Sequence, residues 1–383
     1  MIKEILLNNL NHFKESDSPI HYYFSPGRVN LIGEHTDYSG GFVFPMAIDL
    51  GIYAAVRREE GSINVFSTAF EEMGVQTVKL NLFEHKHKDF RVYIQAMLWA
   101  LKDSGYPVTQ GFQLSLHSTL PDGAGLSSSA ALEMLIGVIA QDIMGYTIDR
   151  KSLALIAKKA ENEFVGVQSG IMDQFAVGFG QKDHAVHLNT ETLDFERVPF
   201  SNDAVTLVLC NTNKKRALVE SAYNERFHSV QMIQKHFDKV LGRVSMAEWL
   251  EKSGQFDDLE RRRGRHIVLE NRRTLEAKKA LIDNDWLALG ELITQSHHSL
   301  QDDFEVSCTE LDFLVEEHIQ LGALGARMTG AGFGGTMLAL YQGPLPHFGP
   351  LKDRYHEQFG LRLDIYTAQS SDSVRRINEK DVL

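Results

Sequence analysis

The residues most suited to chemistry lie in a glycine- and serine-rich segment at positions 120–133, which has the sequence LPDGAGLSSSAALE. A stretch at 111–116 precedes it, and the alternation of apolar and polar residues there predicts a strand. The residues at 130–140 are rich in Ala, Leu and Met and predict a helix. The segment is therefore a turn that ends at a helix N-terminus, where glycines allow close backbone approach and N–H groups are free. Together with the serine hydroxyls and the helix dipole, this arrangement favours a phosphate group.

The segment differs from two familiar phosphate-binding motifs. It lacks the Gly-Lys-Ser/Thr ending of a Walker A loop, and Ser128 stands where the dinucleotide fingerprint has its third glycine. A plain tight turn with a serine cap is the alternative interpretation. Three consecutive serines at 127–129 weigh against that alternative, because serine is a poor residue for the interior of a helix.

A second polar segment, residues 25–41, is dense in charged groups and punctuated by glycines, which is typical of a site loop on a rigid frame. Glu34, His35 and Asp37 could be metal ligands. They could instead accept hydrogen bonds from a polyhydroxylated ligand, and a site built in this way rejects analogues that lack the hydroxyl. A solvated turn is a third interpretation, which the clustering with Arg28 makes less favourable.

Asp173 is the third candidate, because it lies in an apolar stretch with several glycines nearby. A carboxylate in an apolar setting requires a partner or a function. The alternative is an exposed Asp that caps a helix N-terminus, which is common. A further glycine-rich segment at 325–335 leads into an apolar strand at 336–341, and two glycine-rich loops in one chain support ligand contact better than one does.

The elements that must position these segments follow from hydrophobic periodicity. The predicted elements are strands at 22–24, 42–56, 63–66 and 204–210, and helices at 90–103, 152–163 and 285–298. The helix at 90–103 has apolar residues at helical spacing and is predicted to pack in the core without a functional role. Ser245 and Glu248 predict a capping box. The arginine cluster at 261–265 is interpreted as a solvated face beside acidic neighbours.

Composition limits the classes of function. The 383 residues suggest about two domains, which we place at 1–200 and 201–383. The net charge of −12 argues against a nucleic-acid or anionic-membrane partner. The two cysteines make a disulfide framework or a cysteine-based zinc site unfavourable and fit a reducing cytosol. No signal peptide or spanning apolar run is evident, so we expect a cytoplasmic protein without an obligate protein partner.

Three of these segments together resemble the GHMP small-molecule kinases and, within them, the galactokinases. Residues 27–38, with the sequence GRVNLIGEHTDY, resemble the galactokinase signature, while 120–131 and 327–335 resemble the ATP loop and the third motif of the superfamily. Only the first motif is specific, because mevalonate and homoserine kinases share the other two. Ser39 and Gly40 depart from the usual pattern at a turn. The resemblance implies an α+β fold of two domains with the active site in the cleft between them.

The resemblance also implies roles for individual residues. The ATP phosphates would be held by Gly123, Ala124, Gly125, Leu126, Ser127, Ser128 and Ser129, and Ser67 would border the adenine pocket. The sugar would be held by Glu34, His35, Thr36, Asp37, Gly170 and Tyr223. Ser129 and Glu161 would bind Mg²⁺, an ion that takes few protein oxygens. Asp173 would be the catalytic base, and Arg28 would keep it ionised or stabilise the transferred phosphoryl group.

The implied reaction is phosphoryl transfer from ATP to the anomeric hydroxyl of D-galactose, which opens galactose catabolism by the Leloir pathway. Alternatives are a kinase for a related sugar such as N-acetylgalactosamine or arabinose, a non-catalytic galactose and ATP sensor, and a plain nucleotide-binding module. The intact serine loop at 127–131 favours an enzyme over a sensor. A nucleotide-binding module would leave Arg28, Asp173 and the Glu34–Asp37 cluster without a use.

Overall fold

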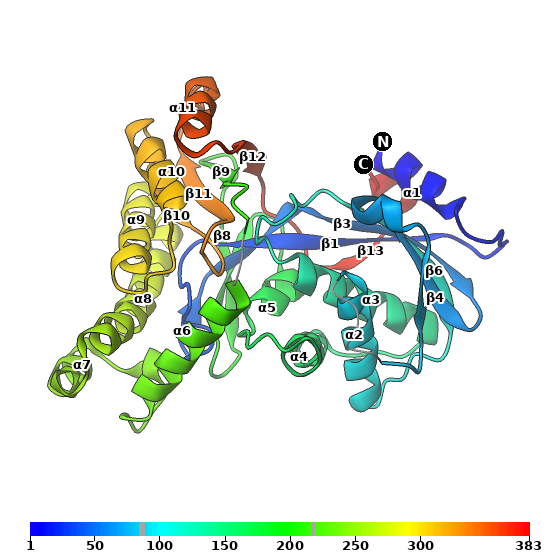
Figure 1. Cartoon of the computed structure of the whole chain (residues 1–383), viewed down its shortest axis with the longest axis horizontal. Helices are drawn as coiled ribbons and strands as arrows, with labels where there is room; N and C mark the ends of the chain where they lie inside the picture. Colours follow the sequence, from blue (N-terminus) through cyan, green and yellow to red (C-terminus); the bar gives the residue numbers. More distant parts are fainter. Residues whose placement is uncertain (84–88, 216–218) are drawn as a thin grey trace.

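The structure is a computed structural model that describes the whole chain apart from residues 84–88 and 216–218. The N-terminal half is built on a six-stranded sheet (Figure 1). In spatial order its strands are β13 (Arg375–Ile377), β1 (His21–Asn30), β3 (Pro45–Glu59), β6 (Gly111–Ser118), β4 (Ser62–Ser67) and β5 (Gln76–Lys79). All neighbouring strands are antiparallel except β4 and β6.

Helices cover both faces of this sheet, and the period of two along each strand decides which side chains they meet. The face toward α1 (Ile2–Leu10) carries Tyr22, Phe24 and Tyr53. The opposite face carries Tyr23 and Ala54, which belong to the large core. That core is covered by α2 (Arg91–Asp103), α3 (Ser128–Met144), α4 (Arg150–Lys159), the π-helix η2 (Ala160–Val165) and α5 (Met172–Phe179).

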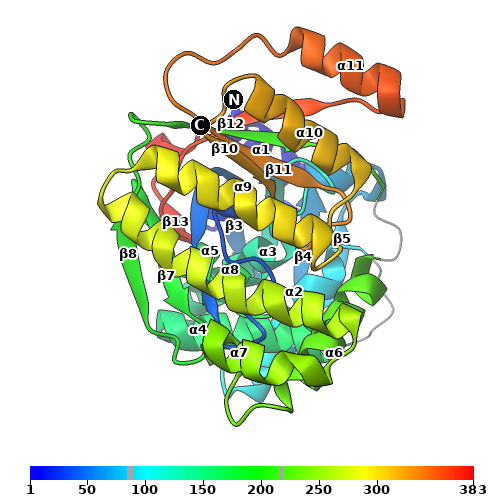
Figure 2. The same ribbon diagram turned by 90° about the vertical axis from the view of Figure 1, so that its left-hand side faces the viewer.

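The C-terminal half forms a second, four-stranded antiparallel sheet. Its strands, in spatial order, are β10 (Gly325–Met328), β11 (Thr336–Tyr341), β9 (Thr206–Asn211) and β12 (Asp364–Ala368). Its helices are α6 (Val219–Gln234), α7 (Met246–Lys252), α8 (Asp258–Ile282), α9 (Trp286–Asp302), α10 (Thr309–Gln320) and α11 (Gly349–Phe359). The long helices α8 and α9 run side by side and form a layer in front of the rest of the molecule in Figure 2.

Two smaller features complete the fold. A three-stranded sheet contains β2 (Phe42–Val43), β7 (His184–Asn189) and β8 (Phe195–Pro199). Short helical turns lie at η1 (Thr68–Met73), η3 (Leu241–Arg243), η4 (Ser253–Gln255) and η5 (Glu379–Asp381).

Although β13 comes from the end of the chain, it pairs with β1 in the first sheet, at Tyr22–Phe24. The division of the chain near residue 200 remains a prediction.

The predicted elements agree with the structure in most places. The strand at 336–341 and the Ser245–Glu248 capping box are confirmed. The strand predicted over 42–56 is divided into β2 and β3, and the helix predicted over 152–163 becomes a π-helix at residue 160. Within the part of the chain that the structure describes, no helix is both long and apolar enough to cross a membrane.

The interpretation of the arginine cluster at 261–265 as a solvated face is wrong for one residue. Arg263 is only 4% exposed and pairs with Glu225 of α6, with 2.6 Å between Nη1 and Oε1. Its helix, α8, begins at a capping box formed by Asp257 and Glu260. The position of Arg263 on the inner side of this helix, against α6, outweighs the charged character of the local sequence.

Candidate active site

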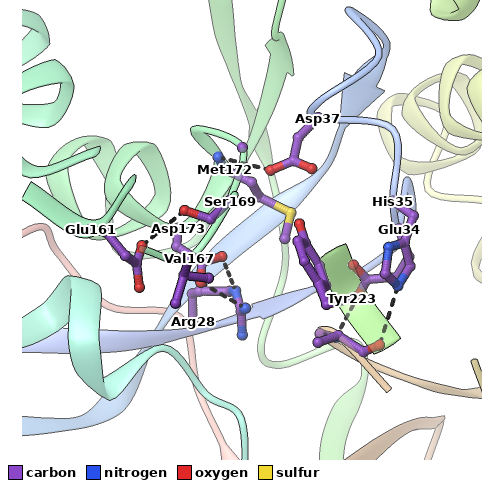
Figure 3. A pocket seen from close by; sticks show the side chains of 13 residues that line it. Arg28, Glu34, His35, Asp37, Glu161, Val167, Ser169, Met172, Asp173 and Tyr223 are labelled. Atoms are coloured by element: carbon purple, nitrogen blue, oxygen red, sulfur yellow. Dashed lines mark hydrogen bonds and ion pairs between the residues drawn. The ribbon is translucent and has the colours of Figure 1, made fainter. Parts of the chain in front are cut away.

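A cavity of about 150 Å³ lies where the two halves of the molecule meet. Figure 3 shows its lining, to which β1 contributes Arg28 and the following loop contributes Glu34, His35 and Asp37. The segment from η2 to α5, at 161–173, contributes Glu161, Ser169 and Asp173. The C-terminal half adds Tyr223 of α6 and the loop at 330–331. The cavity thus lies between the two halves of the molecule, where the family resemblance implied the active site.

Arg28 and Asp173, which both line the cavity, form a bidentate ion pair (Figure 3). Arg28 Nε donates to Asp173 Oδ1 at 2.8 Å, and Nη2 donates to Oδ2 at 3.0 Å. The Arg28 side chain is 5% exposed, whereas that of Asp173 is 27% exposed and can meet a ligand. Such a planar, charge-assisted pair fixes the direction of the carboxylate.

The position of Asp173 excludes the helix-cap interpretation. Helix α5 begins at Met172 and its N-cap is Ile171, so Asp173 lies inside the first turn. The dipole of the helix favours negative charge there. The side chain points to Arg28 and also accepts a hydrogen bond from the Ser127 hydroxyl, instead of capping the helix.

Arg28 also touches the ATP loop. Its Nη1 donates to the Gly125 carbonyl oxygen at 2.8 Å, and its backbone N–H donates to the Leu126 oxygen at 3.1 Å. The preceding residue, Gly27, lies at a register shift between β1 and β3. A Cβ atom there would be 2.9 Å from the backbone oxygen of Leu126, so glycine allows β1 to approach the loop this closely.

The ATP loop borders a second cavity, of about 340 Å³. Its lining includes the predicted residues Ser67, Gly123, Ala124, Gly125, Leu126, Ser128 and Ser129. Ser127 is the exception, because it flanks the start of α3 with a left-handed backbone (φ 62°) and its hydroxyl is directed to Asp173. The loop thus presents most of its residues to this second cavity, while Ser127 contacts Asp173, which lines the first.

Sequence reasoning missed the aromatic wall of this second cavity. Phe90 and Tyr93, which belong to the segment predicted to serve only the core, line it together with Phe70. The rings of Phe70 and Phe90 stack with their centroids 5.0 Å apart. Flat apolar walls of this kind suit a planar heterocycle such as a nucleotide base. Periodicity alone gave no signal for this role, because a lining residue and a core residue look alike on a helix.

Ser129 and Glu161 connect the two cavities. Ser129 lines the second cavity and Glu161 lines the first, and the Ser129 hydroxyl donates to Glu161 Oε1 at 2.9 Å. Ser169 Oγ at 3.1 Å and Gln174 Nε2 at 2.8 Å both donate to the other carboxylate oxygen. Burial raises the pKa of Glu161, and the charge of Asp173 adds to this effect. Ser129 and Glu161 offer only oxygen donors, and Ser129 lines the cavity that the ATP loop borders, so these residues fit Mg²⁺.

The Glu34 carboxylate is fixed by the third motif. Its Oε1 accepts from the Gly330 N–H at 2.7 Å and lies 3.0 Å from Nη2 of the fully buried Arg327. Arg327 comes from β10 and Glu34 from the loop after β1, so the pair joins the two halves of the molecule. Glu34 is 1% exposed and lines the first cavity.

His35 is neutral and has a defined tautomer. Its Nε2 lies 3.2 Å from the Ala331 carbonyl oxygen, which can only accept, so Nε2 carries the proton. Its Nδ1, at 2.8 Å from the Tyr38 hydroxyl, therefore accepts. Burial lowers the pKa of His35 to about 3. Because both ring nitrogens are engaged, a metal-ligand role for His35 is unfavourable, and among the described residues no cluster of three His, Cys, Asp or Glu side chains could hold a metal ion.

Asp37 faces the cavity beside Gly170. Its Oδ2 accepts from the Met172 N–H at 3.4 Å (Figure 3). A Cβ atom at Gly170 would overlap the Asp37 carboxylate, so glycine is required for this approach. Burial and the charge of Asp173 raise the pKa of Asp37 to about 6.

Thr36 and Tyr223 differ in their relation to the cavity. Thr36 is fully buried and does not line it; its hydroxyl lies 2.8 Å from the Gly33 oxygen and 2.7 Å from the Phe42 oxygen, which closes the loop. A direct sugar contact by Thr36 therefore has no support in this geometry. Tyr223 lines the cavity, with its ring centroid 5.4 Å from that of His35.

The cavity also contains residues that the sequence analysis did not assign to it. These are Val167, Ser169, Met172, Gly330 and Ala331. Gly330 and Ala331 belong to the third motif, which was recognised without a role in sugar binding. Ser169 and Met172 lie within three residues of Gly170, which was assigned to sugar binding. Their closeness to Gly170 in the sequence was the one feature that could have predicted their place in the cavity.

Family models match most of these segments. Residues 10–58 match the galactokinase galactose-binding signature. Residues 92–181 match the N-terminal domain of GHMP kinases, and residues 277–346 match their C-terminal domain. The signature therefore contains β1, Arg28 and the loop that carries Glu34 and Asp37.

Individual relatives are similar over nearly their whole length. A galactokinase of Streptococcus suis is 42% identical over 94% of this chain and 95% of that protein. A galactokinase of Bacillus subtilis is 39% identical over 94% of this chain and 95% of that protein. The crystal structure of Lactococcus lactis galactokinase complexed with galactose superposes with a TM-score of 0.90, at 39% identity, and covers 98% of this chain and 99% of that one.

A mevalonate kinase structure shares the fold at a TM-score of 0.65 and 17% identity. The much higher identity to galactokinases, over almost all of the chain, separates this protein from that branch of the superfamily. The protein is a kinase with the GHMP fold, and it belongs to the galactokinase family.

Proposed function

We propose that this kinase transfers the γ-phosphoryl group of ATP to the anomeric hydroxyl of D-galactose and that Asp173 accepts the proton of that hydroxyl. One observation supports this assignment above all. Asp173 is a partly exposed carboxylate in the lining of the cavity that Glu34 and Asp37 also line, and its partner Arg28 holds the ATP loop through Gly125. The proposed base thus lies between the site of the acceptor and the site of the donor.

The chemical step needs alignment and charge neutralisation more than covalent help from the protein. The sugar hydroxyl gives its proton to a carboxylate oxygen of Asp173 while its oxygen forms a bond to the γ-phosphorus. The bond from phosphorus to the β,γ-bridging oxygen breaks, and ADP leaves with that electron pair. Arg28, which is nearly buried, supplies a fixed positive charge beside the reacting atoms.

The sugar would be recognised by groups that accept or donate hydrogen bonds around the cavity. Asp37 offers carboxylate oxygens, and Tyr223 offers a hydroxyl whose pKa burial raises well above its usual value, so that it remains a donor. Glu34 is held in one orientation by Gly330 and Arg327. Such pre-positioned polar groups discriminate strongly against a ligand that lacks the matching hydroxyl.

Ser129 and Glu161 would hold Mg²⁺. When bound, this ion neutralises charge on the phosphates. Ser169 and Gln174 hold the Glu161 carboxylate from the opposite side, so its direction toward Ser129 is set before any ligand arrives. The N–H groups at the start of α3, which begins at Ser128, would receive the phosphate oxygens.

A substrate panel tests the proposal. Release of ADP is measured with D-galactose, D-glucose, N-acetylgalactosamine and arabinose at fixed ATP and Mg²⁺, and the product of the best substrate is identified by NMR. We expect D-galactose to give the highest kcat/KM and the phosphate to be at its first carbon. Equal or greater turnover of another sugar, or phosphate at another carbon, would overturn the assignment.

A further inference from the structure

One face of α8 meets the loop at Gly33 and Glu34 and carries buried polar side chains. No motif in the sequence marked this face of the helix. Resting on the proposed function, we propose that Glu270 is a positioning residue for galactose. Glu270 does not line the cavity that we propose binds galactose, which we call the sugar cavity. Instead, it holds the backbone of Gly33 and Glu34 and thereby sets the direction of side chains that do line it.

The contacts of Glu270 are dense and buried. Its side chain is completely inaccessible to solvent. Oε1 accepts from the Gly33 N–H at 2.9 Å, the Glu34 N–H at 3.3 Å and the Ser296 hydroxyl at 2.6 Å. Oε2 accepts from Arg273 Nε at 2.8 Å. These donors and the Arg273 charge lower the pKa of Glu270 despite its burial, so the group is an anion that four donors satisfy.

A second residue of α8 completes the hold on Glu34. His266 is four residues before Glu270 and therefore lies on the same helix face. Its Nε2 is 3.1 Å from the Glu34 carbonyl oxygen and must donate to it. Both backbone polar groups of Glu34 are thus bound by one helix, the N–H by Glu270 and the carbonyl by His266.

The backbone N–H groups of this loop need hydrogen-bond acceptors from outside the loop, because the loop backbone cannot form the hydrogen-bond ladder of a strand. Gly33 and His35, on either side of Glu34, both have left-handed backbones, with φ of 99° and 62°. A Cβ atom at Gly33 would be 2.7 Å from the Phe42 oxygen, so the loop is also tightly enclosed. Buried N–H groups in such a loop require an acceptor from elsewhere in the fold. Glu270 supplies it for two successive residues.

The geometry separates this role from the ATP side. Gly33 and Glu34 lead directly to the sugar cavity, whereas the ATP loop is held by Arg28 and by the start of α3. Loss of the Glu270 carboxylate should therefore disturb the sugar and leave the nucleotide unaffected. A merely structural residue would change both affinities or only the melting temperature.

The test compares Glu270→Gln with a matched control on the same helix. Glu276→Gln removes the same charge at a side chain that is 51% exposed and pairs only with Arg272 among the described residues. The amide of Glu270→Gln offers a single acceptor oxygen and turns an N–H₂ group toward either the loop or Arg273. We expect the KM for galactose to rise about tenfold or more, while the KM for ATP stays within about twofold. The control should match the wild type in both.

A second variant guards against misfolding. Ser296→Ala removes one donor to Glu270 and leaves the carboxylate in place, and we expect the galactose KM to rise about two- to fivefold. Calorimetric galactose binding gives the same comparison without turnover. Folded Glu270→Gln with an unchanged galactose KM, or with equal increases for galactose and ATP, overturns the inference. If the wild type prefers another sugar, the proposed function fails first, and the Glu270 comparison is made with that sugar.

Discussion

Replacement of Asp173 by Asn tests the proposed base most directly. Asn has nearly the same shape, and its oxygen can still accept from Arg28 Nε, which lies 2.8 Å from Oδ1 in the wild type. Its amide nitrogen cannot accept either the sugar proton or the bond from Arg28 Nη2, which is 3.0 Å from Oδ2. The variant therefore removes the base and one of the two bonds to Arg28, while the Ser127 hydroxyl, which donates to Oδ2 in the wild type, can turn to accept from the amide.

The two losses act on different quantities. Loss of a general base costs about 10² to 10⁴ in rate, which corresponds to about 3 to 5 kcal/mol in the activation barrier. Weakening of the ion pair acts on folding stability. Breaking a fully buried pair costs about 3 to 5 kcal/mol, but Asp173 is 27% exposed and keeps one bond to Arg28, so we expect about 1 to 2 kcal/mol.

The assay separates these terms. Turnover is measured by ADP release, ligand binding by calorimetry and stability by thermal unfolding. We expect kcat to fall at least about a hundredfold, while the dissociation constants of galactose and ATP change less than about tenfold. Asp283→Asn, at the exposed end of α8, is the matched control and should resemble the wild type. A folded Asp173→Asn protein with kcat within about fivefold of the wild type refutes the base assignment.

Three further predictions concern the carboxyl groups of Glu161, Asp37 and Glu133. Glu161→Ala should raise the Mg²⁺ concentration for half-maximal activity, and an unchanged titration would remove Glu161 from the metal site. The pKa of Asp37 is about 6, so its carboxylate becomes protonated as the pH falls from 7 to 5. The galactose KM should rise over that range, and Asp37→Asn should make the galactose KM less dependent on pH. Burial raises the pKa of Glu133 well above its usual value, so the folded protein keeps a proton on Glu133 that the unfolded chain releases. The free energy of unfolding therefore falls as the pH rises above the pKa that Glu133 has in the unfolded chain. Glu133→Gln should remove that loss, which grows by up to about 1.4 kcal/mol per pH unit; equal pH dependence of unfolding in both proteins would contradict it.

Local rules account for the parts of the structure that were predicted. The ATP loop was recognisable because the glycines, the serines and the helix start lie within fourteen successive residues, 120–133. The strand at 336–341 and the Ser245–Glu248 capping box were predicted because their determinants are also close in sequence. The helix at 90–103 was predicted as an element, but the contribution of Phe90 and Tyr93 to the cavity that the ATP loop borders was not. Residues that line a cavity and residues that pack in the core give the same hydrophobic periodicity along a helix.

The residues that could do the chemistry were apparent from the sequence alone, because Arg28, Glu34, Asp37 and Asp173 are polar groups in stretches where glycines mark an unusual backbone. Their partners were decided only by the tertiary structure. Asp173 meets Arg28 across 145 residues, and the Glu34 N–H meets Glu270 across 236. Periodicity places a side chain on one face of a helix, but it does not say which distant loop packs there. The burial that shifts the pKa of Asp37 and the acceptor that Glu270 supplies arise only when those distant segments exclude water together.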